Sequence, residues 1–447
     1  MGNLPKVCVI GAGCSGTAAT KALTERGIEA DCYEATDNVG GLWVYTGNEQ
    51  ERGSSAKTAA YRSLHINTSR NRMEYSDYPM PSSFPDFPSH QQIASYFNSY
   101  VDHFGIRDRI SFNDPVEHAE LRPDGIWEVS TGRSGTQLYD AVVVANGHHW
   151  DARWPEPAFP GEFNGKQMHS HDYVDNAGFE GKNVVVLGMG NSAMDIAVET
   201  SLVANNVFLA ARRGAHILPK YMLGRPSDEF VASPTIPFEI RIRFFRALHR
   251  LAIGRMSRYG MPEPDHKLGE AHPTISSEIL SRVAHGEVQP KPNIAELCGD
   301  TVRFTDGSEE PVDVIVYCTG YRVSFPFFDK DFISAPDNDL PLFRRVFKPD
   351  VPSVSFIGLL QPLGAIMPLA EAQSQWVADY LRGEYALPDR KQLQRLIDDE
   401  RTAMFSRYVA SKRHTMQVDF DDYLHELAKE RQRGAERARA SGFALPI

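Results

Sequence analysis

Val7-Cys8-Val9-Ile10-Gly11-Ala12-Gly13-Cys14-Ser15-Gly16 is the stretch that decides the fold of this 447-residue chain. Its four apolar residues predict a buried parallel strand, and glycines at the spacing Gly-x-Gly-x-x-Gly predict a sharp turn into a helix. Glycines there let the backbone approach a pyrophosphate, which the N–H groups and dipole of the helix N-terminus stabilise. We therefore predict that residues 11–16 form a dinucleotide site.

The same pattern occurs a second time. Val184-Val185-Val186-Leu187 precede Gly188-Met189-Gly190-Asn191-Ser192-Ala193, where Ala193 takes the place of the third glycine, a replacement that the pattern allows. Each motif follows an apolar strand and opens a helix, so two ligand-free tight turns are the weaker interpretation. We predict an α/β fold with two dinucleotide-binding Rossmann-like domains.

The strands that follow the two motifs end in residues of opposite charge. Ala30-Asp31-Cys32-Tyr33 leads to Glu34, whose carboxylate can accept hydrogen bonds from ribose hydroxyls. Val207-Phe208-Leu209-Ala210-Ala211 leads to Arg212 and Arg213, and guanidinium groups suit the 2′-phosphate of NADPH. We predict FAD at the first motif and NADPH at the second, with a solvated basic loop as the alternative for the arginines.

The composition is that of an ordinary globular protein. With 42% hydrophobic and 23% charged residues, the chain has room for two or three domains. The net charge of -11 argues against nucleic acid or an anionic membrane as the main partner. The five cysteines are scattered without metal spacing, so we expect buried thiols, a cytoplasmic location and no metal. We expect neither a cleaved leader nor a transmembrane anchor.

The order of segments predicts that the smaller NADPH domain is inserted in the FAD domain. The first part of the FAD-binding domain is expected at 1–173, the NADPH-binding domain with a helical insertion at 174–290, and the second part of the FAD-binding domain at 291–447. The first sheet lacks its closing strands, so we expect the C-terminal part to return to it. The amphipathic segment 241–256 is expected to face the core, with contact to a membrane surface as the alternative.

Phe163-Asn164-Gly165-Lys166-Gln167-Met168-His169-Ser170-His171-Asp172-Tyr173 lies between the two motifs. It matches without a gap the F-x-G-x-x-x-H-x-x-x-Y signature of the flavin-containing monooxygenases, which that family carries directly before its second glycine motif. Taken alone, His169 is a structural histidine at a domain crossing. The resemblance implies that it belongs to the cofactor-binding region together with Tyr173.

Other segments resemble the same family over nearly the full length. Gly40-Gly41-Leu42-Trp43 resembles its flavin-contacting segment, Cys318-Thr319-Gly320-Tyr321 its late linker, and residues 413–419 its tail. Asn67-Thr68-Ser69 resembles the stretch that places an asparagine near the flavin and the nicotinamide. A turn formed by Asn67 with Thr68 and Ser69 is the alternative. Asn146 stands where the family has a threonine in its earlier linker.

The predicted site follows from the motifs and the resemblance together. Asn67 is the predicted catalytic residue. The predicted cofactor-binding residues are Gly11, Ala12, Gly13, Cys14, Ser15, Gly16, Glu34, Gly41, Leu42, Trp43, Asn67, Thr68, His169, Tyr173, Gly188, Gly190, Asn191, Ser192, Ala193, Asp195, Arg212, Arg213 and Gln373. Gln373 belongs to a helix after residues 362–368 whose N-terminus could stabilise negative charge on the flavin.

The resemblance implies an NADPH- and O₂-dependent monooxygenase that forms a C4a-hydroperoxyflavin and oxygenates an amine nitrogen or a sulfide sulfur. Baeyer–Villiger oxygenation of ketones is one alternative, although enzymes of that type end the linker signature in Trp where this chain has Tyr173. A non-catalytic redox sensor that binds both cofactors is another. Pyridine-nucleotide disulfide reductases need a close cysteine pair, which the sequence lacks. A homodimer is the expected assembly.

Overall fold

The computed structural model describes residues 4–47, 57–231, 236, 238–335, 338–407 and 416–446. Its contacts divide the chain into two compact units. The first unit comprises residues 1–58, 68–151 and 322–447, and the second comprises residues 59–67 and 152–321. The second unit is larger than the expected 174–290, because strands on both sides of that range pair into its sheet.

The first unit is built on a five-stranded parallel sheet with the order β23-β7-β1-β2-β3. The expected strand–turn–helix is present as β1 and α1. The C-terminal part returns to this sheet as predicted, because β23 pairs with β7 at its edge. The strands are β1 Lys6–Ile10, β2 Glu29–Tyr33, β3 Ile110–Ser111, β7 Ala141–Val144 and β23 Val354–Phe356.

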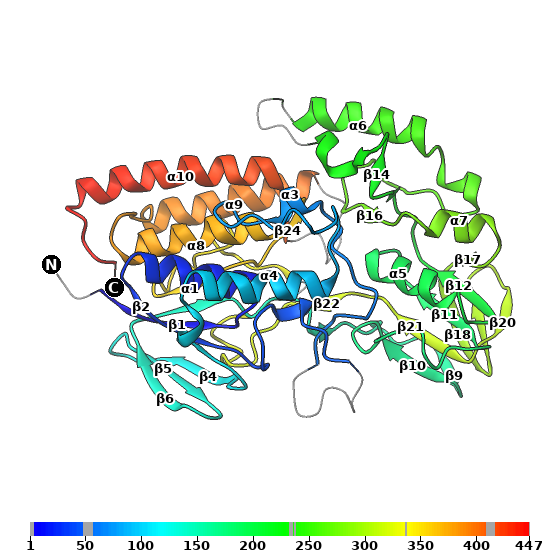
Figure 1. The fold of residues 1–447 in the computed structure, drawn as a ribbon, viewed down its shortest axis with the longest axis horizontal. Helices are drawn as coiled ribbons and strands as arrows, with labels where there is room; N and C mark the ends of the chain where they lie inside the picture. The colour runs from blue at the N-terminus through cyan, green and yellow to red at the C-terminus, as the bar shows by residue number, and fades with distance from the viewer. Residues whose placement is uncertain are drawn as a thin grey trace. The chain divides into compact units, whose positions relative to one another are not determined.

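Two different layers cover this sheet, as Figure 1 shows. Helix α1 packs along α8, and α8 in turn packs against α10. On the other face lies an antiparallel sheet of β4, β5 and β6, whose Trp127 and Val129 pack in one cluster with Cys8 and Ile10. The further elements are η1 Gly41–Trp43, α1 Cys14–Glu25, α3 Arg70–Met73, α4 His90–His103, η2 Arg107–Arg109, β4 Val116–Leu121, β5 Trp127–Thr131, β6 Gly135–Tyr139, β24 Gln361–Leu363, α8 Met367–Leu381, α9 Arg390–Arg407, β25 Gln417–Asp419 and α10 Phe420–Ala440.

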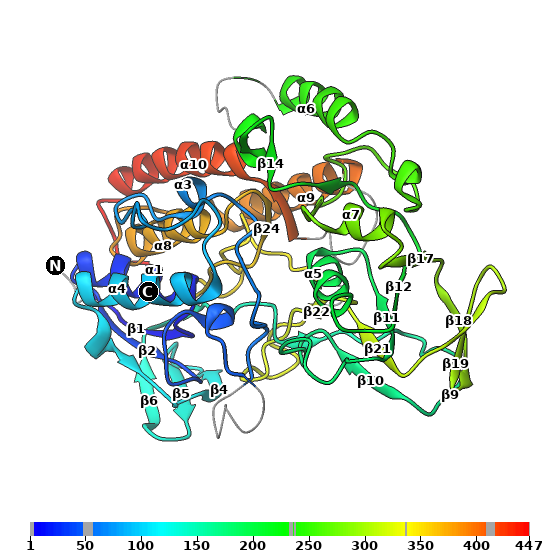
Figure 2. The ribbon, with the colours of Figure 1, turned by 45° about the vertical axis from the view of Figure 1, so that its right-hand side comes forward.

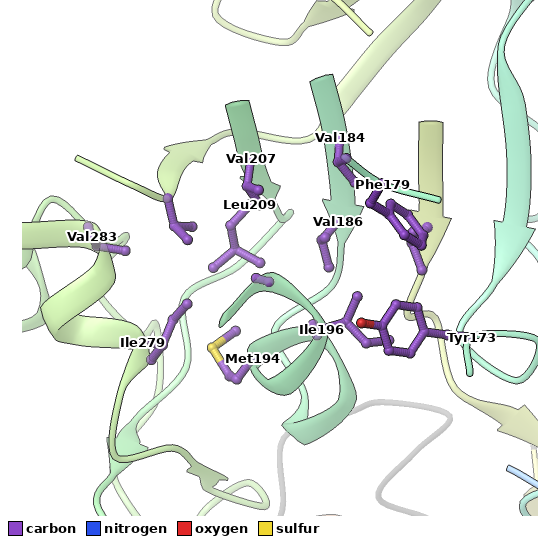
Figure 3. Packing of buried hydrophobic residues seen from close by; sticks show 14 of the residues in the cluster. Tyr173, Phe179, Val184, Val186, Met194, Ile196, Val207, Leu209, Ile279 and Val283 are labelled. Carbon is purple, nitrogen blue, oxygen red and sulfur yellow. The ribbon is translucent and has the colours of Figure 1, made fainter. Parts of the chain in front are cut away.

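The second unit has its own five-stranded parallel sheet, with the order β10-β21-β11-β12-β17 (Figure 2). Figure 3 shows the core between this sheet and α5, where Val186 and Leu209 of the strands face Met194 and Ile196 of the helix. The elements of this core are β10 Lys166–His169, β11 Asn183–Leu187, α5 Asn191–Thr200, β12 Asn206–Ala210, α7 Ile279–Ala284, β17 Gln289–Lys291 and β21 Val314–Tyr317.

Two smaller parts complete the second unit. An outer sheet has the order β20-β19-β18-β9, in which β19 and β20 pair antiparallel. Its strands are β9 Gly161–Phe163, β18 Ile294–Gly299, β19 Thr301–Phe304 and β20 Glu309–Pro311. The remaining elements are β13 Ile217–Leu218, β14 Tyr221–Met222, β15 Arg225–Pro226, η3 Ser227–Val231, α6 Phe238–Ala252, η4 Met256–Tyr259 and β16 Thr274–Ile275. Short strands β8 Asp151–Ala152 and β22 Tyr321–Arg322 lie where the chain passes between the units.

Helix α6 only partly fulfils the expectation of a core-facing helix. It buries Ile242 and Phe245, but Phe244 is 61% exposed and Leu251 86% exposed. Its apolar residues therefore lie on two faces rather than on one. None of the helices in the described ranges combines the length and the apolar composition that crossing a membrane requires.

Candidate functional site

The first glycine turn is packed so tightly that two of its glycines are required by the protein itself. Gly11 has φ +97°, and a Cβ on it would lie 2.8 Å from the carbonyl oxygen of Ala145. A Cβ on Gly16 would lie 1.7 Å from the carbonyl oxygen of Gly11. Any larger residue at these two positions would force the strand and the helix apart.

Gly13 differs, because the protein chain leaves room beside it. Its backbone is extended, with φ -72° and ψ -170°, and among the described residues a Cβ there would meet only Gly41, at an ordinary 3.6 Å. Helix α1 begins directly after Gly13 with no side-chain cap and no acidic residue in its first turn. The open space and the uncapped N–H groups fit the pyrophosphate of a dinucleotide.

Glu34 is the carboxylate at the end of β2, and its hydrogen bonds tie that strand end to the turn. One oxygen accepts the N–H of Ala12 at 2.7 Å, and the other accepts the N–H and the hydroxyl of Thr36, each at 2.8 Å. Burial raises the pKa of this carboxyl, and the backbone N–H bonds oppose that rise. These bonds fix the carboxylate beside the turn, where the sequence predicts the ribose of a dinucleotide.

The segment around Trp43 lies against the same turn. Gly40 N donates to Ala12 O at 3.0 Å, and a Cβ on Gly41 would lie 3.1 Å from the Cα of Gly13. Leu42 and Trp43 follow in η1 and are only half-buried. The structure therefore brings together residues 11–16, Glu34 and residues 41–43, which the sequence places at one site.

Gln373 has a protein partner at each end of its side-chain amide. It is fully buried in α8; its side-chain oxygen accepts the N–H of Gly358 at 2.9 Å, and its side-chain nitrogen donates to the Tyr423 hydroxyl at 2.6 Å. Both ends of the amide thus have protein partners, and contact with a cofactor stays a prediction. The N-terminus of α8 has no side-chain cap, and nearby Thr68 donates its hydroxyl to Gly364 O at 3.4 Å.

The second glycine turn repeats the geometry of the first in the other unit. Gly188 has φ +150°, and a Cβ on it would lie 2.6 Å from the carbonyl oxygen of Cys318. Helix α5 begins after Gly190 with no side-chain cap, Ser192 in its first turn is half-buried, and Ala193 is fully buried in the place of the third glycine. The side-chain oxygen of Asn191 accepts the N–H of Ile275 at 2.8 Å and so holds β16 beside the turn.

Arg212 and Arg213 follow β12 and are both exposed, but their surroundings differ. The guanidinium of Arg213 forms an ion pair with Asp265 at 3.2 Å. Arg212 has neither an ion pair nor a hydrogen bond from its side chain to any described residue. Of the two predicted phosphate ligands, Arg212 alone is therefore unengaged among the described residues.

The segment 59–67 belongs to the second unit, and side chains on α5 hold it there. The Tyr61 hydroxyl donates to Asp195, and the Ser63 hydroxyl donates to Glu199 at 2.7 Å. Burial raises the pKa of Asp195 to about 6, although the bond from Tyr61 opposes the rise. The sequence carries no signal for this attachment, because the paired residues lie more than 130 positions apart.

Asn67 lies at the end of this segment, and the unit boundary falls between it and Thr68. It is half-buried, and its side-chain amide makes no hydrogen bond within the described part of the chain. A turn role would require such a bond to the backbone that follows. The amide is thus available to a ligand.

His169 and Tyr173 are core residues of the second unit. The His169 ring accepts the N–H of His171 at Nδ1, at 3.1 Å, and burial lowers its pKa to about 4. Tyr173 is fully buried, with its ring 5.7 Å from Phe179 and 6.1 Å from Tyr61. The structural interpretation of His169 agrees with this geometry, and contact of either residue with a cofactor stays a prediction. Of the tail that resembles the family, residues 413–415 lie outside the described residues.

The family model and the similar proteins of known name indicate the same family for this chain. A family model described as flavin-binding monooxygenase-like matches residues 5–434. The chain is 37% identical to flavin-containing monooxygenase 5 of Oryctolagus cuniculus, over 95% of this chain and 82% of that protein. It is 34% identical to dimethylaniline monooxygenase [N-oxide-forming] 2 of Rattus norvegicus, with the same two shares.

Two solved structures are similar in fold. The S-allyl-L-cysteine S-oxygenase of Allium sativum superposes with a TM-score of 0.71 at 26% identity, over 98% of this chain and 92% of that one. A cyclohexanone monooxygenase superposes with the same TM-score over 99% of this chain and 98% of that one. At 18% identity, the second likeness concerns the fold alone.

Proposed function

The chain belongs to the flavin-binding monooxygenase-like family, and from this membership we propose how its two units serve an FAD- and NADPH-dependent monooxygenase. The enzyme consumes NADPH and O₂ and oxygenates soft nucleophiles. Bound FAD would supply the redox chemistry that couples hydride from NADPH to the activation of O₂, with one oxygen atom going to the substrate and the other to water. Gly13 is the single observation that carries the FAD assignment, because among the described residues only Gly41 would contact a side chain placed there, at an ordinary 3.6 Å.

The residues of the first unit bind the flavin nucleotide. The N–H groups at the start of α1 donate to its pyrophosphate, and the carboxylate of Glu34 orients its ribose. Residues 41–43 lie beside the turn, where they contact the flavin and limit the access of water to it.

The residues of the second unit bind NADPH. The N-terminus of α5 receives the pyrophosphate, and Arg212 binds the 2′-phosphate because its guanidinium is exposed and unengaged within the described part of the protein. Asn67 orients the nicotinamide through its unpaired amide, and the bonds of Tyr61 and Ser63 hold the segment that carries it.

We propose amines and sulfides as the substrates. Two similar proteins are named for N-oxide formation and for S-oxygenation, and both are similar to this chain over nearly its whole length. Tyr173 ends the linker signature and agrees with this choice over ketones.

Turnover tests the function directly. We expect NADPH oxidation, O₂ uptake and oxygenated product in comparable amounts with at least one tertiary amine or thioether, in a panel that also contains ketones. Hydrogen peroxide is followed in parallel. NADPH oxidation that yields only peroxide with every amine and sulfide would contradict the proposal, and product from ketones alone would reassign the enzyme to ketone oxygenation.

We also propose a cytoplasmic location and a homodimer. All five cysteines are free thiols, although Cys14, Cys298 and Cys318 are half-buried rather than fully buried. Free thiols suit a reducing compartment. Cell fractionation tests the location, and light scattering coupled to gel filtration tests the assembly.

A further inference from the structure

A loop of the insertion, residues 262–266, lies directly against the turn that carries the two arginines. A Cβ on Gly214 would lie 2.2 Å from the carbonyl oxygen of Pro262, so the two backbones approach as closely as a glycine permits. The ring of His216 donates from Nε2 to His266 O at 2.8 Å, and the two imidazole rings lie 5.3 Å apart. The loop therefore has a defined position beside Arg213.

Asp265 is the acidic residue of this loop, and it has two partners. One carboxylate oxygen accepts a hydrogen bond from Nδ1 of the His266 ring at 2.9 Å. The other oxygen lies 3.2 Å from Nε of Arg213. The hydrogen bond from His266 and the charge of Arg213 both lower the pKa of Asp265. The carboxyl is thus a carboxylate at neutral pH, and it faces the residue that would otherwise offer a second guanidinium to a phosphate.

We propose that Asp265 is a specificity-determining residue that weakens the binding of nucleotide 2′-phosphates by pairing with Arg213. The inference rests on the proposed NADPH site at the end of β12. Asp265 weakens the binding of a 2′-phosphate in two ways. It occupies the guanidinium of Arg213, and its negative charge repels a phosphate nearby. Arg212 then binds the 2′-phosphate alone, and the affinity for nucleotides without that phosphate does not depend on Asp265.

The probes for this proposal are 2′,5′-ADP and 5′-AMP, which differ only in the 2′-phosphate. Asp265→Asn keeps an acceptor for the His266 ring while it removes the charge. In this variant we expect 2′,5′-ADP to bind roughly 3- to 10-fold more tightly and 5′-AMP to bind as before, because exposed ion pairs are modest in strength. Isothermal titration of the purified enzyme at fixed pH and low salt measures both dissociation constants.

A double-mutant cycle assigns the effect to Arg213. In an Arg213→Ala background, the part of the gain that comes from freeing the guanidinium disappears, so Asp265→Asn should tighten 2′,5′-ADP less than it does in the wild type. Asp124→Asn is the matched control, since Asp124 forms a similarly exposed pair with Arg122 at 2.8 Å in the other unit. This control should change neither dissociation constant.

Three outcomes would overturn the proposal. An unchanged or weaker affinity of Asp265→Asn for 2′,5′-ADP would contradict it. Equal weakening of both probes would show that Asp265 only supports the loop. A gain of the same size in the Arg213→Ala background would separate Asp265 from Arg213. If the wild-type enzyme bound 2′,5′-ADP no better than 5′-AMP, the NADPH site itself would be wrong, which is a distinct result.

Discussion

The three glycines of the first turn have different physical reasons to be glycine, and Gly13 is the one for which we propose a ligand as the reason. In Gly13→Ala we expect a folded, soluble protein that carries at least about tenfold less FAD, because the added methyl group occupies the space beside the pyrophosphate and meets only Gly41 within the protein. The ratio of flavin absorbance to protein after gel filtration measures this loss, and circular dichroism checks the fold.

Gly16→Ala is the control for that experiment. Its Cβ would lie 1.7 Å from the carbonyl oxygen of Gly11, so this variant should be insoluble or strongly destabilised with or without flavin. A Gly13→Ala protein with full flavin content, or one as unstable as Gly16→Ala, would contradict the assignment of Gly13.

Asn67 allows a test of the catalytic site. Asn67→Leu removes the unpaired amide while it keeps a side chain of similar size, so we expect normal flavin content and stability but a larger share of NADPH oxidised to hydrogen peroxide. Loss of one hydrogen bond to the nicotinamide corresponds to about 0.5–1.5 kcal/mol, or roughly a two- to tenfold change in the ratio of peroxide to product. The same ratio as in the wild type would show that Asn67 does not contact the reacting groups.

The sequence indicated which of the predicted residues lie close together better than it indicated their hydrogen-bond and ion-pair partners. Gly11, Gly16 and Glu34 belong to one local pattern, and the structure brings them together because that pattern is a single strand–turn–helix. The pairing of Arg213 with Asp265 joins positions in different segments, and no local spacing encodes it. Gln373 was predicted from its helix, but its bond to Tyr423 depends on how a later helix packs.

At the scale of elements, the attachment of segment 59–67 to α5 predicts an effect on stability. Tyr61→Phe leaves the buried carboxylate of Asp195 without its hydroxyl donor, which should cost about 1–3 kcal/mol of unfolding free energy for the second unit. Urea unfolding measures the cost. Ser63→Ala is the control, because its bond to Glu199 is exposed and its loss should cost less than about 0.5 kcal/mol.

The same variant links stability to catalysis. If the attachment also positions Asn67, Tyr61→Phe should raise peroxide release as Asn67→Leu does, whereas Ser63→Ala should not. A Tyr61→Phe enzyme that is as stable and as well coupled as the wild type would mean that the tyrosine ring, packed 6.1 Å from Tyr173, holds the segment by itself.

Apolar runs predicted β1, β11 and β12 because strands buried on both faces carry a strong local signal. The sheet of β4, β5 and β6 was not predicted. Its alternation of buried Trp127, Val129 and Thr131 with more exposed neighbours, after the turn at Gly125, was a detectable signal for a hairpin. No local signal indicated that the apolar residues of α6 lie on two faces of the helix, because the burial of that helix depends on the surrounding loops.

At the scale of the whole molecule, acid stability should depend on His169. Its pKa in the folded protein is about 4, below its ordinary 6.5, so its stabilising contribution is complete above pH 6.5 and is lost as the pH falls through 4. The contribution of Asp195 to stability has the opposite pH dependence. Its pKa of about 6 exceeds its ordinary 3.8, so this contribution is lost as the pH rises through 6.

His169→Gln keeps an acceptor for the His171 N–H but cannot be protonated. Between pH 6.5 and 4 we expect this variant to lose less unfolding free energy than the wild type, by roughly 2–4 kcal/mol. Urea unfolding at several pH values measures the difference. Parallel pH profiles for the two proteins would show that the burial of His169 does not contribute to acid lability.

The pairing of β23 with β7 has a consequence for biosynthesis. The strand that completes the first sheet is translated after the whole of residues 152–321, so the ribosome finishes the second unit roughly 10–40 s after β7 at 5–20 residues per second, and before the first unit has all its strands. Ser15 meets Gly358 only once that late segment has emerged. The glycine turn that is synthesised first is therefore completed only after residues 152–321 have been translated.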